Sequence, residues 1–166
     1  MTNSKQNFLF KPVELDLHAE ACIRFRDDSF VVSFGDAKKF YEADGQGAER
    51  YIEWLKGKIA KDPNSVVHIW QNDEIVGQIE LGLLKNEPDF GYVNLFYLTP
   101  AKRGQGFGSI LDQHAIEHFH SLGFKKMKLC VSPTNVRAFS FYKKLGWVDL
   151  GPRPGHPEVN FMEKNI

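Results

Sequence analysis

A glycine-rich turn between a strand-like segment and an amphipathic segment constrains the fold of this chain more than any other feature. Residues 92–98 are rich in aromatic and aliphatic side chains and predict a strand that ends at Thr99-Pro100. Residues 103–108 read Arg-Gly-Gln-Gly-Phe-Gly, and apolar residues then recur at helical spacing as far as Leu122. Since the first amides of a helix have no partner within it, and glycine lets a ligand approach the backbone, this arrangement predicts an anion site. Arg103 adds a fixed positive charge with a planar donor fork.

The glycine turn does not by itself identify the anion. The Walker pattern ends in Gly-Lys-Ser or Gly-Lys-Thr, whereas Gly108 is followed here by Ser109-Ile110. The dinucleotide fingerprint places its third glycine one residue later and normally follows the first strand, whereas this turn lies well past the middle of the chain. A tight turn without a ligand, and a nucleotide-binding domain that uses the turn for another phosphate, therefore remain alternatives.

The composition limits the class of protein. A chain of 166 residues can form one domain with a sizeable core, and we expect a single domain over residues 1–166. Lys plus Arg and Asp plus Glu both total 21, which gives no support for broad binding to nucleic acid or to a membrane surface. No run reaches the ~18 apolar residues of a membrane span, and residues 1–7 lack a signal core. Cys22 and Cys130 do not form a metal-type pair and indicate reduced thiols in a cytoplasmic protein.

The rest of the sequence alternates between strand-like and helical segments. Strands are predicted at 8–15, 65–71, 75–84, 92–98, 126–131, 147–150 and 159–163, and helices at 17–30, 49–61, 109–122 and 135–145. Residues 85–90 and 151–157 are expected to be loops, Asp16 to cap the first helix, and Ile75 to share a strand face with Ile79. This order predicts an α+β, or mixed α/β, domain with a single central, mostly antiparallel sheet and helices on both faces.

Two short motifs occur in the order and at the separation typical of one family. The first is Arg or Gln, two residues, Gly, one residue, then Gly or Ala, and Arg103, Gly106 and Gly108 match it. The second begins with Asn and ends with Gly and a bulky apolar residue, and its matching residues are Asn135, Ala138, Phe141, Tyr142, Gly146 and Trp147. The chain therefore resembles the GNAT superfamily of acyl-CoA N-acyltransferases. The element order extends this resemblance over nearly the whole length.

The resemblance implies acetyl-CoA as the cosubstrate and no metal. In the family, the glycine turn holds the pyrophosphate of coenzyme A through backbone amides, and the strand before it pairs with the pantetheine arm like an added strand. An N–H of that strand, here that of Leu98, would polarise the thioester carbonyl. The cofactor-binding residues expected on this basis are Phe96, Tyr97, Leu98, Arg103, Gly104, Gln105, Gly106, Phe107, Gly108, Ser109 and Asn135.

Asn135 and Tyr142 each have two interpretations. Asn135 resembles the residue that hydrogen-bonds the pantetheine region, and its position at a helix start fits an N-cap equally well. Tyr142 resembles the general acid that gives a proton to the departing sulfur, which suits a phenol, because its ordinary pKa is about 10. Tyr142 also shares a helix face with Ala138 and Leu145, as a core aromatic would. The surrounding motif favours the acid.

The expected acceptor is a small-molecule amine or a peptide amine, which arrives as an ammonium and must lose a proton. The family has no single fixed base. Glu80 is the only acid within residues 75–84 and lies opposite Ile79, so it is the expected general base, with Asp89 or a histidine on a water chain as alternatives. Cys130 as a nucleophile is disfavoured, because the family attacks the thioester directly. The sequence does not name the acceptor, which we expect near the first two helices.

The sequence thus predicts a cytoplasmic N-acetyltransferase that moves an acetyl group from acetyl-CoA to a primary amine by direct attack, with a homodimer as one option for its assembly. A non-catalytic acyl-CoA-binding or sensing module would keep the glycine turn but would need neither an acid nor a base. The presence of Tyr142 favours the enzyme.

Overall fold

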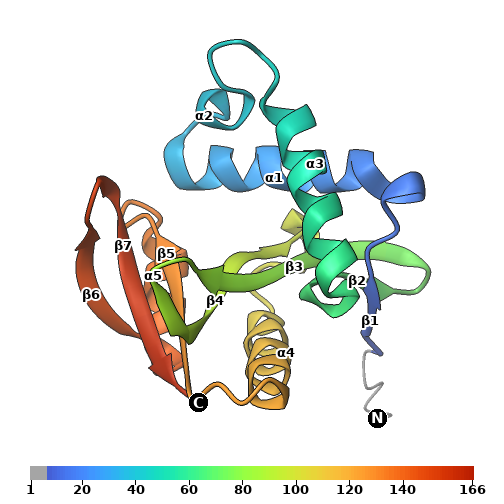
Figure 1. Ribbon diagram of the computed structural model, residues 1–166. Helices are drawn as coiled ribbons and strands as arrows, with labels where there is room; N and C mark the ends of the chain where they lie inside the picture. Colours follow the sequence, from blue (N-terminus) through green and yellow to red (C-terminus); the bar gives the residue numbers. More distant parts are fainter. Residues whose placement is uncertain (1–6) are drawn as a thin grey trace.

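The computed structural model describes residues 7–166, which form one seven-stranded sheet with helices on both faces (Figure 1). The strands are β1 (Leu9–Pro12), β2 (Val66–Gln71), β3 (Glu74–Leu84), β4 (Glu87–Leu98), β5 (Lys126–Val131), β6 (Val148–Arg153) and β7 (His156–Asn165). The helices are α1 (Leu15–Phe34), α2 (Lys38–Tyr41), α3 (Gly47–Lys61), α4 (Gly108–Ser121) and α5 (Val136–Lys144), with short 3-10 turns η1 (Pro63–Ser65) and η2 (Pro100–Lys102).

The order of strands across the sheet is β1-β2-β3-β4-β5-β7-β6. Every neighbouring pair is antiparallel except β4 and β5, which run parallel because α4 forms the crossover between them. The predicted mixed α/β class, with a mostly antiparallel sheet and helices on both faces, is confirmed. Within residues 7–166, no helix combines the length and the apolar character that a membrane span requires.

The two faces of the sheet carry separate cores. Helix α4 buries Leu111, Ala115 and Phe119, spaced four residues apart, against strand residues such as Ile79 and Leu129. Helices α1, α2 and α3 cover the opposite face, where Cys22, Phe40 and Leu55 pack together. Figure 1 shows α1, α2 and α3 on one side of the sheet and α4 on the other.

Strands β4 and β5 separate along their length, and this opening positions the site. Their pairing covers only Gly91 to Val93 on β4. One residue further, the pairing of β4 with β3 shifts register, so that Asn94 is an extra residue on β4. Such a bulge bends a strand and increases its twist. Beyond Asn94, β4 stays paired with β3 and leaves its other edge open.

Several predicted boundaries differ from the structure. Residues 87–90, predicted as loop, begin β4, because residues 85 and 86 make a tight turn and Glu87 pairs with Leu84. Residues 151–157, also predicted as loop, mostly belong to the hairpin of β6 and β7, with a turn at Pro154 and Gly155. The predicted strand at 8–15 is shorter, and its last residue begins α1.

Helix α1 and strand β3 also depart from expectation. The N-cap of α1 is Glu14, and Asp16 lies in the first turn, where its charge favours the positive end of the helix dipole. The helix continues to Phe34 and ends at Gly35, whose φ of 88° is left-handed. Ile75 packs with the core under α1 rather than with Ile79, because a register shift between β2 and β3 turns it to the other face.

Candidate active site

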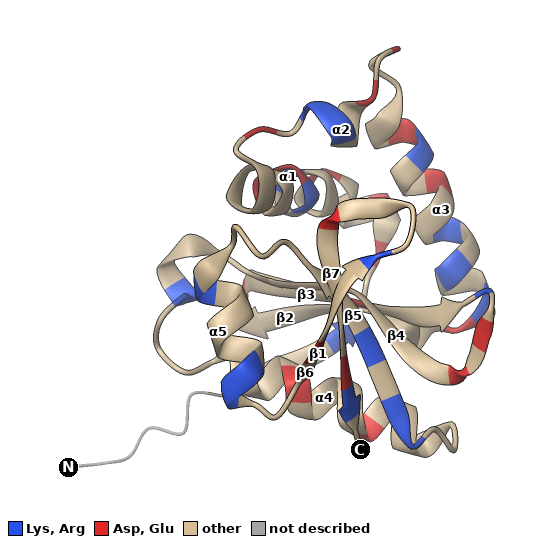
Figure 2. Cartoon of the chain, turned by 90° about the vertical axis from the view of Figure 1, so that its left-hand side faces the viewer, with Lys and Arg blue, Asp and Glu red and all other residues tan. Residues whose placement is uncertain are grey.

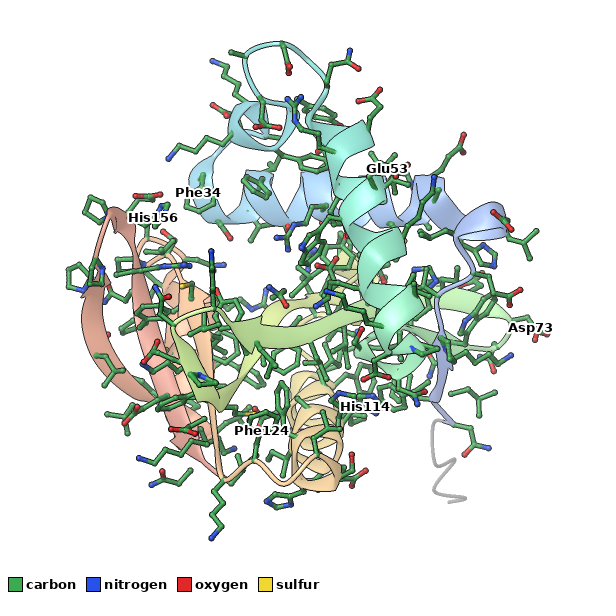
Figure 3. All side chains as sticks on the ribbon, in the orientation of Figure 1. Phe34, Glu53, Asp73, His114, Phe124 and His156 are labelled. Atoms are coloured by element: carbon green, nitrogen blue, oxygen red, sulfur yellow. The ribbon has the colours of Figure 1, made fainter. Side chains whose placement is uncertain are left out.

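A cavity of about 680 Å³ opens where β4 and β5 separate. Its walls come from the second half of α1, the open edge of β4, the glycine turn, the end of β5 and one face of α5. Two contacts join distant segments beside this cavity. Thr134 Oγ1 lies 3.2 Å from the carbonyl oxygen of Ser33, and Lys39 Nζ lies 3.8 Å from Glu158 Oε1. Figure 3 labels Phe34 at the end of α1 and His156 at the tip of the β6–β7 hairpin, which mark these two sides.

The open edge of β4 presents backbone groups to this cavity. The Thr99 N–H donates to the Val76 carbonyl on β3 at 2.9 Å. Because backbone groups alternate along a strand, the N–H groups of Phe96 and Leu98 point away from β3, toward the gap. Two carbonyls on this edge already have partners: Arg26 Nη1 donates to Asn94 at 3.2 Å, and Arg103 Nε donates to Leu98 at 2.9 Å. The amides of Phe96 and Leu98 are thus available to an extended ligand.

The glycine turn has the backbone shape that its sequence predicts. Gly104 and Gly106 have φ values of 72° and 82°, which side chains other than glycine rarely adopt. A Cβ at Gly106 would meet open space, whereas one at Gly104 would overlap the guanidinium of Arg137. Helix α4 begins at Gly108, and no side chain caps its first amides. The turn therefore combines free amides, room for a ligand and a neighbouring cation.

Arg103 holds the end of β4 rather than standing free at the turn. Its Nη2 lies 2.5 Å from Asp28 Oδ2, and the Tyr97 hydroxyl donates to the same oxygen at 2.6 Å. Burial alone would raise the pKa of Asp28, but the hydrogen bonds from Tyr97 and Arg103 and the charge of Arg103 keep that pKa below its usual value. Arg103 thus connects α1 to the strand end beside the turn.

Tyr142 lies on α5 and lines the cavity. Burial, and secondarily the charge of Asp112, raise the pKa of its hydroxyl above the usual value for a phenol. The ring also packs against Phe96 and Trp147, with centroid separations of 6.4 Å and 6.0 Å. The ring therefore packs against the core while the residue lines the cavity, and the role of Tyr142 as an acid stays a prediction.

Asn135 is the N-cap of α5, where its Oδ1 accepts from the Ala138 N–H at 3.3 Å. It also lines the cavity, so capping does not remove it from reach of a ligand.

Glu80 lies beneath the cavity rather than in its wall. Its side chain is fully buried, and its Oε1 accepts from the Tyr51 hydroxyl and from Gln78 Nε2, the latter at 2.9 Å. Its Oε2 has no hydrogen-bond partner among the described residues and lies 3.9 Å from Nη1 of Arg26, which does line the cavity. The side chain of Arg26 therefore lies between the Glu80 carboxylate and the cavity.

The structure brings most of the expected site residues to one place. The cavity wall contains Phe96, Tyr97, Leu98, Arg103, Gly104, Gly106, Phe107, Gly108, Asn135 and Tyr142. Gln105, Ser109 and Glu80 are not in that wall. The side chains of Gln105 and Ser109 bond back to the carbonyls of Ala101 and Gly106, at 2.5 Å and 2.9 Å. The roles of all these residues stay predictions.

The sequence placed Arg26 and Asp28 in the helical region expected near the acceptor, but it did not predict their contacts with β4 and Arg103, and it assigned no role to Arg137. Arg26 and Asp28 lie far along the chain from the strand they contact, and nothing in the local sequence of α1 signals that contact. Arg137 is the second residue of α5, and its guanidinium lies beside Gly104 of the turn. Its place within the second motif, just after Asn135, was the signal available in the sequence. Figure 2 shows basic residues, in blue, on α5. Among residues 7–166, no three His, Cys, Asp or Glu side chains gather as a metal site would need.

A strand edge open to an extended ligand, beside a glycine turn at a helix start, defines the class of proteins that hold an acyl carrier through backbone contacts. Residues 20–147 match the acetyltransferase (GNAT) family, and the chain belongs to that family. The resemblance stated from the motifs is thereby confirmed, and with it the class of the domain, an acyl-CoA-dependent N-acetyltransferase.

Individual relatives are distant in sequence. An uncharacterized N-acetyltransferase of Schizosaccharomyces pombe is 23% identical over 152 residues, which cover 84% of this chain and 62% of that protein. A putative acetyltransferase of Acinetobacter baylyi has a TM-score of 0.74 at 18% identity, over 99% of this chain and 95% of its own. Spermidine N-acetyltransferase of Vibrio cholerae, solved with CoA and spermine, has a TM-score of 0.69 at 17% identity and covers 95% of both chains. These structures share the fold.

Proposed function

We propose that this protein transfers an acetyl group from acetyl-CoA to a primary amine by direct attack of the amine on the thioester. The observation that carries the proposal is the free edge of β4 beside the glycine turn, in one cavity with Tyr142. The cavity volume of about 680 Å³ is within the usual range for small-molecule and cofactor sites.

The cofactor would lie along the cavity from the turn to the base of the opening. Its pyrophosphate would accept from the amides of residues 105–109, near the charge of Arg137. Its pantetheine arm would pair with the exposed backbone of Phe96 and Leu98, as a strand adds to a sheet edge. One of these amides, that of Leu98 in our assignment, would donate to the thioester oxygen as negative charge develops on it.

Tyr142 is proposed as the general acid. The amine nitrogen bonds to the thioester carbon, the carbon–sulfur bond breaks, and the sulfur takes the phenolic proton so that coenzyme A leaves as a thiol. The raised pKa of Tyr142 supports this role, because the phenol stays protonated until negative charge develops on the departing sulfur. The acceptor loses two protons in all: the first goes to the base before the attack, and the second leaves the nitrogen after it has bonded to the carbon and restores the proton of Tyr142.

Glu80 is proposed as the general base, acting through one water molecule. Direct contact with the acceptor does not suit a fully buried carboxylate, but its Oε2 has a free acceptor site close to the cavity-lining Arg26. A buried polar atom without a protein partner is where an internal water is expected. That water would take the ammonium proton and pass one to Glu80.

The acceptor is proposed to be a small-molecule amine or a peptide amine, bound between α1 and the β6–β7 hairpin. The Vibrio cholerae neighbour is named for an amine, spermidine, which supports the class of acceptor but not its identity. We further propose a cytoplasmic protein, because Cys22 and Cys130 are both free. The single-domain organisation and a homodimer remain predictions.

The alternative is a non-catalytic acyl-CoA-binding or sensing module, which would bind the cofactor without transfer. A panel of amines offered with acetyl-CoA, with release of free thiol as the readout, distinguishes the two. Amine-dependent thiol release supports the enzyme. Binding of acetyl-CoA without release by any amine supports the module.

A further inference from the structure

The guanidinium of Arg153, at the end of β6, has no anionic partner among the described residues. Its Nη1 donates to the thiol of Cys130 at 3.4 Å, and its guanidinium lies 5.0 Å from the centre of the Phe161 ring. The side chain is partly buried, and within residues 7–166 it makes no ion pair. A charged donor fork held in place by a cysteine sulfur and an aromatic ring is available to an anionic ligand.

The other cations around the opening are already neutralised or assigned. Arg26 has Glu80 at 3.9 Å, Arg103 has Asp28 at 2.5 Å, and Lys128 has Glu87 at 2.5 Å. Arg137 lies against the glycine turn, where the pyrophosphate is proposed to bind. Lys144 also lines the cavity without an ion pair to any described residue, but it is an exposed lysine near the end of α5. Among these arginines of residues 7–166, Arg153 is therefore the one with neither an ion pair nor a proposed ligand.

Arg153 lies beside the base of the opening, next to two residues of the cavity wall. Tyr92 and Cys130 both line the cavity. Arg153 lies behind that wall, where it donates to Cys130 and is close enough for its charge to lower the pKa of Tyr92. Tyr92 belongs to the last paired stretch of β4 and β5, so the cluster sits at the base of the opening, beyond the Asn94 bulge. A pantetheine arm that runs from the turn along Leu98 and Phe96 would carry its thioester toward this base.

Tyr92 can contribute to binding as a neutral donor. Burial raises the pKa of its hydroxyl, and the charges of Arg153 and Arg26 only partly offset this effect. The hydroxyl therefore keeps its proton and can donate to an anion that Arg153 attracts.

We propose that Arg153 and the Tyr92 hydroxyl form an anion subsite for a carboxylate of the acceptor, so that the preferred acceptor is an amino acid rather than an uncharged amine or a polyamine. The planar guanidinium of Arg153 matches the two oxygens of one carboxylate. A doubly charged phosphate would be less well balanced here. The identity of the acceptor rests on the proposed function. The existence of the anion subsite does not depend on that function.

The first test uses Cys130 as a reporter and needs no turnover. Iodoacetate and iodoacetamide both alkylate a thiolate, so the fraction of Cys130 that is ionised cancels in the ratio of the two rates. Only iodoacetate carries a carboxylate, so the ratio reports how strongly the site attracts that group. Cys22 is fully buried, and the Cys130 peptide is identified by mass spectrometry. We expect the iodoacetate-to-iodoacetamide ratio at Cys130 to be about 10-fold higher in the parent than in Arg153→Gln at low salt. Arg24→Gln, at an exposed arginine of α1 outside the cavity wall, is the matched control and should keep the parent ratio.

An equal ratio in parent and Arg153→Gln overturns the subsite. So does a Cys130 that reacts with neither reagent, because the thiol beside Arg153 would then be closed to the cavity.

The second test compares matched acceptors. The protein is given acetyl-CoA and one of four acceptors, at equal concentrations of the unprotonated amine. The acceptors are an amino acid, its amide, its decarboxylated amine and phosphoethanolamine. We expect the parent to prefer the amino acid by about 10-fold to 100-fold in kcat/KM, and Arg153→Gln to lose that preference with an unchanged KM for acetyl-CoA. A preference for phosphoethanolamine, or one that survives in Arg153→Gln, contradicts the carboxylate assignment. If no amine releases thiol, the proposed function fails, while the alkylation ratio still decides on the subsite.

Discussion

Arg103 Nε donates a 2.9 Å hydrogen bond to the carbonyl oxygen of Leu98, five residues earlier in the chain. This contact satisfies the last carbonyl on the open edge of β4 and leaves the amide of the same residue directed into the cavity. The guanidinium is held in turn by Asp28 of α1. The motif arginine therefore shapes the strand end that is proposed to bind pantetheine, in addition to its charge beside the turn.

Gly106→Val should weaken coenzyme A binding while the fold persists. The added side chain would occupy the open space beside Gly106 and strain a φ of 82°. Gly123→Val is a matched control, because Gly123 has a φ of 85° with equal space around it but lies outside the cavity wall. Each variant should lose about 1–2 kcal/mol of stability. By calorimetry, only Gly106→Val should lose affinity, and parent-like binding by that variant would remove the turn from the phosphate site.

Tyr142→Phe should lower turnover with little change in cofactor affinity. The ring would still pack against Phe96 and Trp147, so only the proton donor is lost. General acid catalysis is worth about 10²–10⁴-fold, which is the expected fall in kcat. Tyr41→Phe, which removes a hydroxyl bonded to Asp27 outside the cavity wall, should keep the parent rate. Unchanged turnover in Tyr142→Phe, with chemistry shown to limit the rate, would leave Tyr142 as a core aromatic only.

Glu80→Gln should depress activity at neutral pH and remove the acidic limb of the pH–rate profile. The amide keeps the shape of the carboxylate and can still accept from Tyr51, but it cannot hold the proton of the acceptor. Asp89→Asn, at an exposed position outside the cavity wall, is the control and should keep the parent profile. If Glu80→Gln retains the parent rate and pH profile, Glu80 is not the base.

His68 should make the fold sensitive to mild acid. Burial lowers the pKa of this imidazole to about 4 from 6.5, although its hydrogen bond with Gln78 acts in the opposite direction. The unfolded chain therefore binds the proton first, and stability falls as the pH drops from 6.5 toward 4. Between pH 7 and pH 5 the loss due to His68 should be about 2 kcal/mol.

Urea unfolding at these two pH values measures this loss. In His68→Gln the pH dependence should shrink by that amount, whereas the exposed His120→Gln should retain it. An undiminished pH dependence in His68→Gln would contradict the assignment.

The local parts of the fold could be predicted because each depends on neighbours in sequence. The bounds of β5 follow from its apolar alternation, and the glycine turn follows from residues that alone tolerate its φ values. The start of β4 was missed because Glu87, Pro88 and Asp89 all disfavour a strand, and the pairing with β3 overrides that local preference.

The site was only partly predictable for a similar reason. The turn, Asn135 and Tyr142 carry motif residues, and the structure places them around one cavity. The partners Arg26 and Asp28 come from a helix whose sequence gives no sign of what it contacts. The burial of Glu80 depends on α3 bringing Tyr51 over β3, which strand periodicity does not reveal.

The most direct test of the account is the effect of acetyl-CoA on the melting temperature of the protein. At about 100 times its dissociation constant, acetyl-CoA should add about 2.7 kcal/mol to the free energy of unfolding and raise Tm accordingly. ATP and NAD at the same concentration should leave Tm unchanged, because the turn lacks the features of their motifs. An unchanged Tm with millimolar acetyl-CoA would contradict the cofactor assignment on which the proposed reaction depends.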